Sequence, residues 1–204
     1  MDKIFTKNIE HESAVKHVTG KAIYTDDISE PKNLLHAVIG YSNCSKGVIK
    51  KIDYKDVLSS EGVVDIITEK DIEGINDVGP IFKGDKIFTS KNIEYYGQPI
   101  FAVIAKTNNL AKKAALKVKI DLKISKPIVS IEEALKKKSF VLKPKHLTRG
   151  NIKDGFKKSD NILKGKLYSG GQDHFYLEGQ IAMTIPQEDN NFLVYSSTQH
   201  PSET

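Results

Sequence analysis

Apolar residues in the first two thirds of the chain fall into short runs that are separated by glycine, proline and polar residues. Residues 34–41, 47–52 and 63–67 are short and mostly apolar, as expected for strands. Residues 100–105 are apolar almost without interruption, which predicts a strand that is covered on both faces. Residues 119–124 alternate polar and apolar side chains, which predicts a strand with one exposed face.

Capping residues stand before the segments that have helical spacing. Thr107, Asn108 and Asn109 are cap candidates for a helix in which the apolar residues recur at helical spacing: Leu110, Ala111, Ala114, Ala115 and Val118. Three further residues predict short helical turns directly after them: Asp53, Thr68 and Ser130, the last with Glu133 in a capping box. The alternation of strands and helices predicts a layered α/β or α+β domain.

The last third of the chain is predicted to be less regular. Residues 136–153 are basic and contain Pro144 and Gly150, which indicates a surface connector with a domain boundary near Arg149. Strands are expected after the connector at 162–168, 177–185 and 192–197. The last two would form a hairpin with a polar connection, and a helix would begin near residue 201. A lone hairpin buries too little surface to be stable by itself.

Composition narrows the possible classes of protein. The 204 residues are 39% hydrophobic and 28% charged, an ordinary globular balance. No apolar run approaches the roughly 20 residues of a membrane span, and the start does not resemble a signal peptide, so a cytoplasmic location is expected. The net charge of +5 comes from scattered lysines among acidic residues, without Trp. This pattern argues against nucleic-acid binding.

Cys44 and His36 are each considered as a possible functional residue and interpreted as structural. Cys44 is the only cysteine, so the chain can form no internal disulfide and cannot supply the four thiolates of a typical iron–sulfur cluster. Any such cluster must lie elsewhere, and Cys44 itself is interpreted as a loop residue. His36 lies within a predicted strand and has no second ligand nearby, which favours a structural histidine over a metal ligand.

The most unusual stretch is residues 169–178, followed by a second polar stretch at residues 195–201. Gly170 and Gly171 can adopt positive φ and allow close approach of a ligand. The amide of Gln172 would then be held on a tight turn, where it could donate and accept hydrogen bonds. From these residues alone, the stretch is either a polar binding loop or an ordinary turn. It has no phosphate-binding glycine pattern.

The other polar residues of this stretch allow two interpretations. If the stretch is extended, His174, Tyr176 and Glu178 share one face. On a helix, His174 and Glu178 could bind zinc together, but a third ligand is missing. Polar packing is the favoured interpretation, and Asp173 has no assigned role.

Residues 170–178 and 196–199 resemble the opening of the molybdenum-cofactor-binding region of the xanthine dehydrogenase/aldehyde oxidase family. Four earlier phrases resemble, in order, the α/β hammerhead domain of that family's molybdenum-binding large subunit: residues 18–27, 35–38, 62–64 and 96–99. The resemblance runs from about residue 11 to residue 204. It implies an α+β fold in which an α/β hammerhead domain precedes an incomplete mixed α/β molybdopterin-binding region. The implied parts are an N-terminal arm (1–16), the hammerhead domain (17–125), a connector (126–150) and the truncated start of the molybdopterin-binding domain (151–204).

The resemblance also implies a site and a reaction. Gln172 would hydrogen-bond an oxo ligand of molybdenum from outside the metal's own ligands, with Gly170 and Gly171 shaping the loop, and no catalytic residue is expected in this chain. The cofactor would be molybdenum–molybdopterin, as molybdopterin or its cytosine dinucleotide. An iron–sulfur subunit and an FAD-binding subunit would carry the other cofactors. The reaction would be hydroxylation of hypoxanthine or xanthine with water as the oxygen source.

Two departures from the family keep alternatives open. Gly179 stands where relatives usually carry threonine or proline. The chain also ends before the family's glycine-rich phrase and general-base glutamate, so it is expected to be inactive without the remainder of the subunit, as a truncated product, gene remnant or split subunit. One alternative is a fragment of an aldehyde or N-heterocycle hydroxylase. Another is a non-catalytic interaction module formed by residues 1–125.

Overall fold

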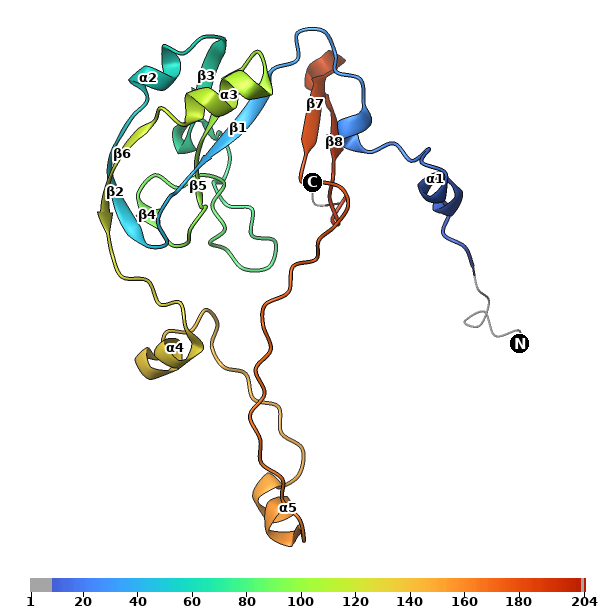
Figure 1. Ribbon diagram of the computed structural model, residues 1–204, viewed down its shortest axis with the longest axis vertical. Helices are drawn as coiled ribbons and strands as arrows, with labels where there is room; N and C mark the ends of the chain where they lie inside the picture. The colour runs from blue at the N-terminus through green and yellow to red at the C-terminus, as the bar shows by residue number, and fades with distance from the viewer. Residues whose placement is uncertain (1–8, 203) are drawn as a thin grey trace. The chain divides into compact units, whose positions relative to one another are not determined.

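The computed structural model describes residues 9–202 and 204, with helices and strands arranged as in Figure 1. Contacts within the chain group its residues into two compact units. One unit consists of residues 33–171, and the other combines the residues up to 32 with those from 172 onward. None of the helices in the described ranges is both long and apolar enough to cross a bilayer.

In the unit of residues 33–171, one sheet has the strand order β1-β5-β3. Strand β5 (Pro99–Ala105) lies in the centre and pairs antiparallel with β1 (His36–Tyr41) and with β3 (Val63–Ile67). Helix α3 (Asn108–Ala115) follows β5 and packs on β1 and β5. Of the three cap candidates, Thr107 caps this helix, because its side chain accepts a hydrogen bond from the Leu110 amide.

The second sheet of this unit has the order β4-β2-β6, and both pairs are antiparallel. Strand β2 (Gly47–Asp53) lies between β4 (Asn92–Ile93) and β6 (Lys119–Ile124). The side chains of β6 alternate between partly buried and exposed near its start, as the alternating sequence predicted. Mixed helices and antiparallel sheets confirm the predicted α+β class.

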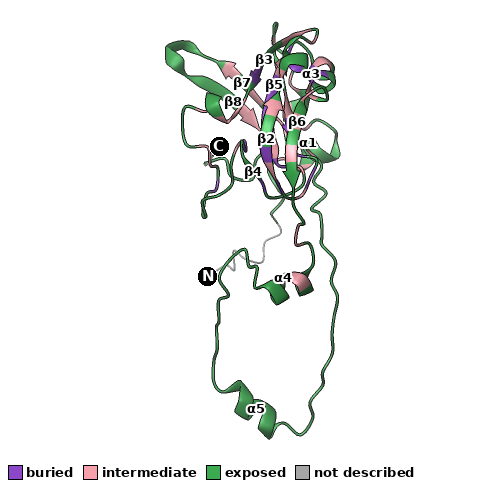
Figure 2. Cartoon of the chain, turned by 90° about the vertical axis from the view of Figure 1, so that its left-hand side faces the viewer, coloured by how far each residue is buried: buried purple, intermediate pink, exposed green. Residues whose placement is uncertain are grey.

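The core of this unit is built around β5, where five of the seven residues are buried. Phe101, Val103 and Ala105 on one face have no exposed surface, and Ile100 and Ala102 on the other face are 2% and 3% exposed. This confirms the strand predicted to be covered on both faces. Figure 2 shows the buried residues concentrated in the sheets and α3. The buried cluster also includes residues of both sheets and two helices: Cys44, Ile49, Val57, Ile66, Ile93, Ile100, Ala111 and Ala114.

The ring of Phe101 requires a glycine on the neighbouring strand. Gly40 of β1 pairs with Phe101, and a Cβ atom at residue 40 would lie 2.2 Å from Cζ of that ring. Tyr54 packs edge-on against the same ring, with the ring centroids 5.2 Å apart. The ring is therefore enclosed and has no space into which it could move.

A buried polar pair closes the loop that leads into β5. Ser42 and Gln98 are both 3% exposed. The Ser42 amide donates to the Gln98 carbonyl over 2.9 Å, and the Gln98 amide donates to Ser42 Oγ over 3.1 Å. The Gln98 side chain accepts from the Glu94 amide over 2.8 Å. Because every buried side-chain polar atom of the described residues is satisfied, the pair adds specificity without an unpaired group.

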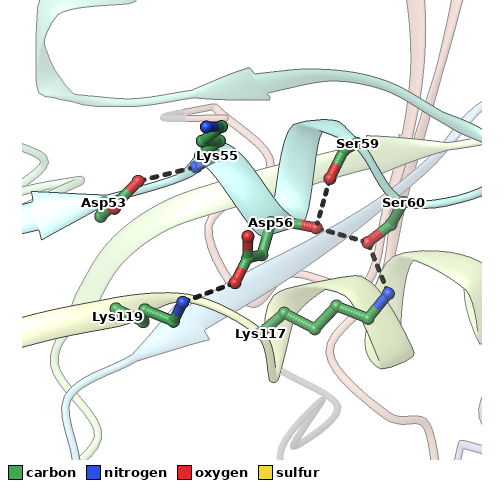
Figure 3. A network of polar contacts seen from close by, with 7 residues as sticks. All are labelled: Asp53, Lys55, Asp56, Ser59, Ser60, Lys117 and Lys119. Carbon is green, nitrogen blue, oxygen red and sulfur yellow. Dashed lines mark hydrogen bonds and ion pairs between the residues drawn. The ribbon is translucent and has the colours of Figure 1, made fainter.

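Short helices α2 (Lys55–Leu58) and η3 (Glu69–Asp71) occur where turns were predicted. The Asp53 carboxylate accepts from the Lys55 amide, and Thr68 caps η3 by accepting from the Lys70 amide. Figure 3 shows how α2 is tied to the start of β6: Lys119 Nζ lies 2.7 Å from Asp56 Oδ2. This ion pair lowers the pKa of Asp56 and raises that of Lys119, but both groups are exposed, so it adds little stability.

The segment after β6 has two short helices, α4 (Ile131–Lys137) and α5 (Ile152–Lys158). Ser130 caps α4 as predicted, and Asn151 caps α5, which the sequence analysis did not predict. Every residue from 135 to 177 is exposed, shown in green in Figure 2. The strand predicted at 162–168 is wrong, because no described strand pairs with these residues and a lone strand leaves its backbone groups unpaired.

The other unit contains α1 (Ala14–Val18), η2 (Thr25–Asp27) and a hairpin of β7 (Ala182–Pro186) and β8 (Phe192–Ser196). The short helix η4 (Glu188–Asn190) forms the polar connection, which confirms the predicted hairpin. Strand β7 starts later than predicted, because residues 177–178 form a bend and Phe175 has a φ of 47°. Residues 201–202 form a turn, not a regular helix.

Replacing Gly40 by alanine tests the enclosed ring. We expect Gly40→Ala to lower the free energy of unfolding by about 1–3 kcal/mol, because the new methyl group overlaps a buried ring. Urea unfolding would measure this change. Gly165→Ala is the matched control, since a Cβ atom there meets nothing within 4 Å, and its effect should stay within about 0.5 kcal/mol. Equal stability of the two variants would contradict the packing described.

The buried phenol of Tyr54 predicts a pH dependence. Burial, and then the negative charge of Asp71, raises the pKa of Tyr54 to about 12. Because the unfolded chain loses this proton near its ordinary pKa of about 10, the contribution to stability is complete below that pH and is lost between pH 10 and 12. The melting temperature (Tm) of Tyr54→Phe should therefore fall less between pH 10 and 12 than the Tm of wild type. Tyr41→Phe, at an exposed tyrosine, should behave as wild type.

Candidate functional site

The predicted binding loop lies between the exposed connector and the hairpin. Gly170, Gly171 and Gln172 are all exposed. The side-chain amide of Gln172 makes no hydrogen bond to any residue in the described part of the chain, so both its donor and its acceptor are available. A Cβ atom at either glycine would meet nothing within 4 Å, so the backbone here is open to a ligand.

The tight turn expected at the paired glycines is not observed. Residues 169–176 contain neither a turn nor a bend, and neither Gly170 nor Gly171 has a positive φ. The positive φ of this stretch occurs instead at Phe175. The physical reason is local: a turn needs a closing hydrogen bond or packing against neighbours, and these residues have neither within the described chain. The extended face expected for His174, Tyr176 and Glu178 is likewise interrupted at Phe175.

The loop is held at Glu178, for which the sequence favoured polar packing over a role as a zinc ligand. Its carboxylate accepts a hydrogen bond from the backbone amide of Thr25 over 2.8 Å, across 153 residues of sequence. Glu178 is partly buried, whereas the residues from Phe175 to Leu177 are exposed. The contact lies at the start of η2, where a helix has free amide groups and favours negative charge.

The turn that presents the Thr25 amide is fixed by its own hydrogen bonds. The Tyr24 amide donates to the Asp27 carboxylate over 3.0 Å, and the Asp27 amide donates back to the Tyr24 carbonyl over 3.0 Å. The Tyr24 hydroxyl lies 3.1 Å from Nδ1 of His17 in α1. These contacts order η2 locally, so the Thr25 amide has a defined direction.

Ser197 joins the second polar stretch to the residues that directly follow the first. Its hydroxyl donates to the Gly179 carbonyl over 2.8 Å and accepts from the Ile181 amide over 2.9 Å. The Ser197 amide donates to the Ile181 carbonyl over 3.0 Å. The base of the hairpin is therefore closed directly after Glu178, and the stretch at 195–201 supports the end of the stretch at 169–178.

This arrangement can offer an uncharged hydrogen-bond donor from a fixed support. Within residues 9–202 and 204, no three His, Cys, Asp or Glu side chains are placed to bind a metal ion together. His174 and Glu178 therefore do not form part of such a group in the described chain. An amide such as Gln172 is suited to an oxygen ligand of a metal centre held by other groups.

The unit of residues 33–171 contains a separate cavity of about 840 Å³. It lies beside the start of β2 and is lined in part by Tyr95 and Tyr96, with Lys46 and Glu94 as its charged residues. No residue of the stretch at 169–178 lines it. Nothing in the described side chains links this cavity to the candidate site.

Two family descriptions match consecutive parts of the chain. Residues 19–126 match the "Aldehyde oxidase and xanthine dehydrogenase, a/b hammerhead domain". Residues 132–204, which include Gln172, match the "Molybdopterin cofactor-binding domain". The first match alone covers more than half of the chain.

Individual proteins agree with these matches. Xanthine dehydrogenase of Dictyostelium discoideum is 38% identical over 199 residues, which cover 98% of this chain and 14% of that protein. Aldehyde oxidase 2 of Mus musculus is 39% identical over 196 residues, which cover 95% of this chain and 14% of that protein. The chain therefore spans about one seventh of the length of these relatives.

Solved structures show the same fold. An aldehyde oxidoreductase of Desulfovibrio gigas has a TM-score of 0.78 at 27% identity, covering 92% of this chain and 23% of that chain. Quinoline 2-oxidoreductase of Pseudomonas putida 86 has a TM-score of 0.78 at 18% identity, covering 95% of this chain and 27% of that chain, a likeness of fold alone. Taken together, the two matches describe a hammerhead domain followed by a molybdopterin cofactor-binding domain. The chain belongs to the aldehyde oxidase and xanthine dehydrogenase family, which confirms the resemblance found in its sequence.

Sequence reasoning found the two polar stretches but not the contact that supports them. Ser197 lies within the stretch 196–199, yet nothing in its surroundings indicated which groups its hydroxyl would bond. Thr25 lies within residues 18–27, one of the stretches that resemble the hammerhead domain. No local pattern could pair it with Glu178, because the two residues are separated by most of the chain.

Removing the Ser197 hydroxyl tests the support of the loop. We expect Ser197→Ala to speed hydrogen exchange of the Ile181 amide by about fivefold to tenfold, since a net hydrogen bond is worth about 1 kcal/mol. Exchange read by NMR or mass spectrometry would measure it. The neighbouring Ser196→Ala is the control, because that hydroxyl makes no hydrogen bond within the described residues. Unchanged exchange in Ser197→Ala would contradict the role given to this hydroxyl.

Proposed function

We propose that this chain is the amino-terminal part of the molybdenum-binding subunit of a xanthine dehydrogenase-like hydroxylase. The assembled enzyme would hydroxylate hypoxanthine or xanthine, with water as the source of oxygen. The observation that carries this proposal is the unpaired amide of Gln172, which lies within the segment matched to the molybdopterin cofactor-binding domain. Identity of 38% to a xanthine dehydrogenase over nearly the whole chain supports the substrate class.

Gln172, Gly170 and Gly171 are the residues that would contact the cofactor. The open backbone at the two glycines leaves room for a bulky group, and the neutral amide suits hydrogen bonding to an oxo ligand. Molybdenum–molybdopterin, when bound, supplies the two-electron oxidation chemistry. In this chain Gln172 would orient and polarise the metal's oxygen ligand, and the other contacts would come from the remainder of the subunit. An iron–sulfur subunit and an FAD-binding subunit would carry electrons away.

Exposed apolar side chains support the existence of a covering partner. Leu163 and Leu167 are 99% and 92% exposed, and Phe175 beside the candidate site is 93% exposed. Exposure of so many large apolar groups is typical of a surface that another part of a protein buries. The remainder of the subunit is the partner that fits, since the relatives are about seven times longer than this chain.

The domain division that fits this proposal is the one expected from sequence. It consists of an arm (1–16), the hammerhead domain (17–125), a connector (126–150) and the start of the molybdopterin-binding domain (151–204). Family matches over 19–126 and 132–204 support the two main parts. A cytoplasmic location is part of the same proposal.

A second candidate is hydroxylation of an aldehyde or an N-heterocycle. It is favoured by the identity to aldehyde oxidase 2, 39%, which is one percentage point above the identity to xanthine dehydrogenase, 38%. The fold is also shared with an aldehyde oxidoreductase and a quinoline 2-oxidoreductase. Both candidates use the same Gln172 site and differ only in the substrate.

The assembled enzyme can separate these candidates. The full-length subunit that contains this sequence, assembled with its electron-transfer partners, is expected to oxidise xanthine with a higher kcat/KM than benzaldehyde or quinoline. The reverse order would favour the second candidate. No oxidation of any of the three by a preparation that contains molybdenum would overturn both.

Gln172→Ala should lower kcat of this enzyme by about tenfold to a hundredfold, because it removes a group that orients a metal ligand. Molybdenum content should change little, since Gln172 is not proposed to bind the metal directly. Gln187→Ala is the matched control, because Gln187 is exposed in the hairpin connection and bonds only the adjacent Pro186 carbonyl through its side chain. Equal rates for the two variants would contradict the role of Gln172.

A further inference from the structure

The two most distinctive phrases of the sequence meet in the structure. The phrase at residues 18–27 ends in η2, and the phrase at 170–178 ends in Glu178. The only side-chain hydrogen bond between them in the described residues joins the Thr25 amide to Glu178 Oε1 at 2.8 Å. This bond attaches the start of the chain to the loop that carries Gln172.

Glu178 is the first fixed point after Gln172. From Gln172 to Leu177 the chain is exposed, and the one side-chain hydrogen bond that the described structure shows there is local, from the Gln180 amide to the Tyr176 hydroxyl. Directly after Glu178, Ser197 holds Gly179 and Ile181. The first contacts that hold the chain after Gln172 therefore lie at Glu178 and at the base of the hairpin.

The chemistry of the bond suits an anchor. A carboxylate that accepts from a backbone amide forms a charge-assisted hydrogen bond, which is stronger than a neutral one. The donor is a main-chain group held by the Tyr24–Asp27 bonds, so it cannot rotate away as a side chain can. The anchor therefore restricts the loop more than a contact between two flexible side chains would.

We propose that Glu178 is a positioning residue that fixes the Gln172 loop to the amino-terminal turn at Thr25. By this route the residues before the hammerhead core help to place the amide beside the cofactor. The inference rests on the proposed function, because it concerns how Gln172 is presented. It assigns no contact between Glu178 and the substrate or the metal.

Three variants isolate the anchor in the full-length, assembled protein. Glu178→Ala removes the acceptor, and Glu178→Gln keeps an acceptor oxygen without the charge. Thr25→Pro removes the donor from the other side, at the first position of η2, where proline is tolerated. The preceding Tyr24 already has the extended backbone that a following proline requires, with φ −97° and ψ 168°. Glu188→Ala is the control, since Glu188 is exposed and its side chain makes no hydrogen bond in the described residues.

Hydrogen exchange gives a readout that does not depend on turnover. The Thr25 amide should exchange about tenfold faster in Glu178→Ala, less so in Glu178→Gln, and as in wild type in Glu188→Ala. Exchange at Thr25 that is unchanged in Glu178→Ala would overturn the proposal.

Kinetics and spectroscopy test the positioning role. Glu178→Ala and Thr25→Pro should each lower kcat about tenfold with a smaller change in KM, and should broaden or shift the Mo(V) electron paramagnetic resonance signal. Combining the two changes should add nothing to either one, because both break the same bond. Glu178→Gln should recover most of the rate.

The outcomes distinguish this inference from the function on which it rests. Wild-type activity in both Glu178→Ala and Thr25→Pro would overturn the positioning role and leave the proposed function standing. Loss of activity in Glu178→Ala alone would also overturn it, since Glu178 would then act through another contact. A wild-type protein without molybdenum or oxidation activity would overturn the proposed function and the positioning role together.

Discussion

The unit of residues 33–171 depends on the burial of strand β5 on both faces. Phe101 fills the space above Gly40 and beside Tyr54, and Val103 and Ala105 continue the same buried line. Because the two outer strands pair with β5 and α3 packs on it, displacement of this strand would separate most of the unit. The buried Ser42–Gln98 pair fixes the entry to the strand, so hydrophobic burial and hydrogen bonding specify the same register.

The candidate site is built in a different way. Its supports are individual hydrogen bonds at Glu178 and Ser197 instead of a packed core. Hydrogen bonds of this kind each contribute about 1–3 kcal/mol, so they orient a loop without burying it. Gln172 keeps an unpaired amide in the described chain, as the proposed contact with a ligand requires. Phe175 and its neighbours Tyr176 and Leu177 are exposed at the same place.

Local patterns predicted the elements whose stability is local or whose apolar pattern is strong. The uninterrupted apolar run identified β5, and Thr107, Thr68 and Ser130 identified helix starts that depend on the capping residue itself. The strand expected at 162–168 failed because its sequence fits a strand but the described chain offers it no partner. The site was predicted only as far as its two polar stretches. The pairing of Thr25 with Glu178 and the burial of Gln98 depend on contacts between residues that are distant in sequence. A pattern within one short stretch of sequence cannot show such contacts.

The separation of Thr25 from Glu178 has a consequence for the order of folding during synthesis. The ribosome adds about 5–20 residues per second, so roughly 8–30 seconds pass between the emergence of the two partners. All six strands of the unit of residues 33–171 are synthesised within that interval and can form their sheets first. The Thr25 amide therefore stays without its Glu178 partner until after the six strands of the other unit have been synthesised.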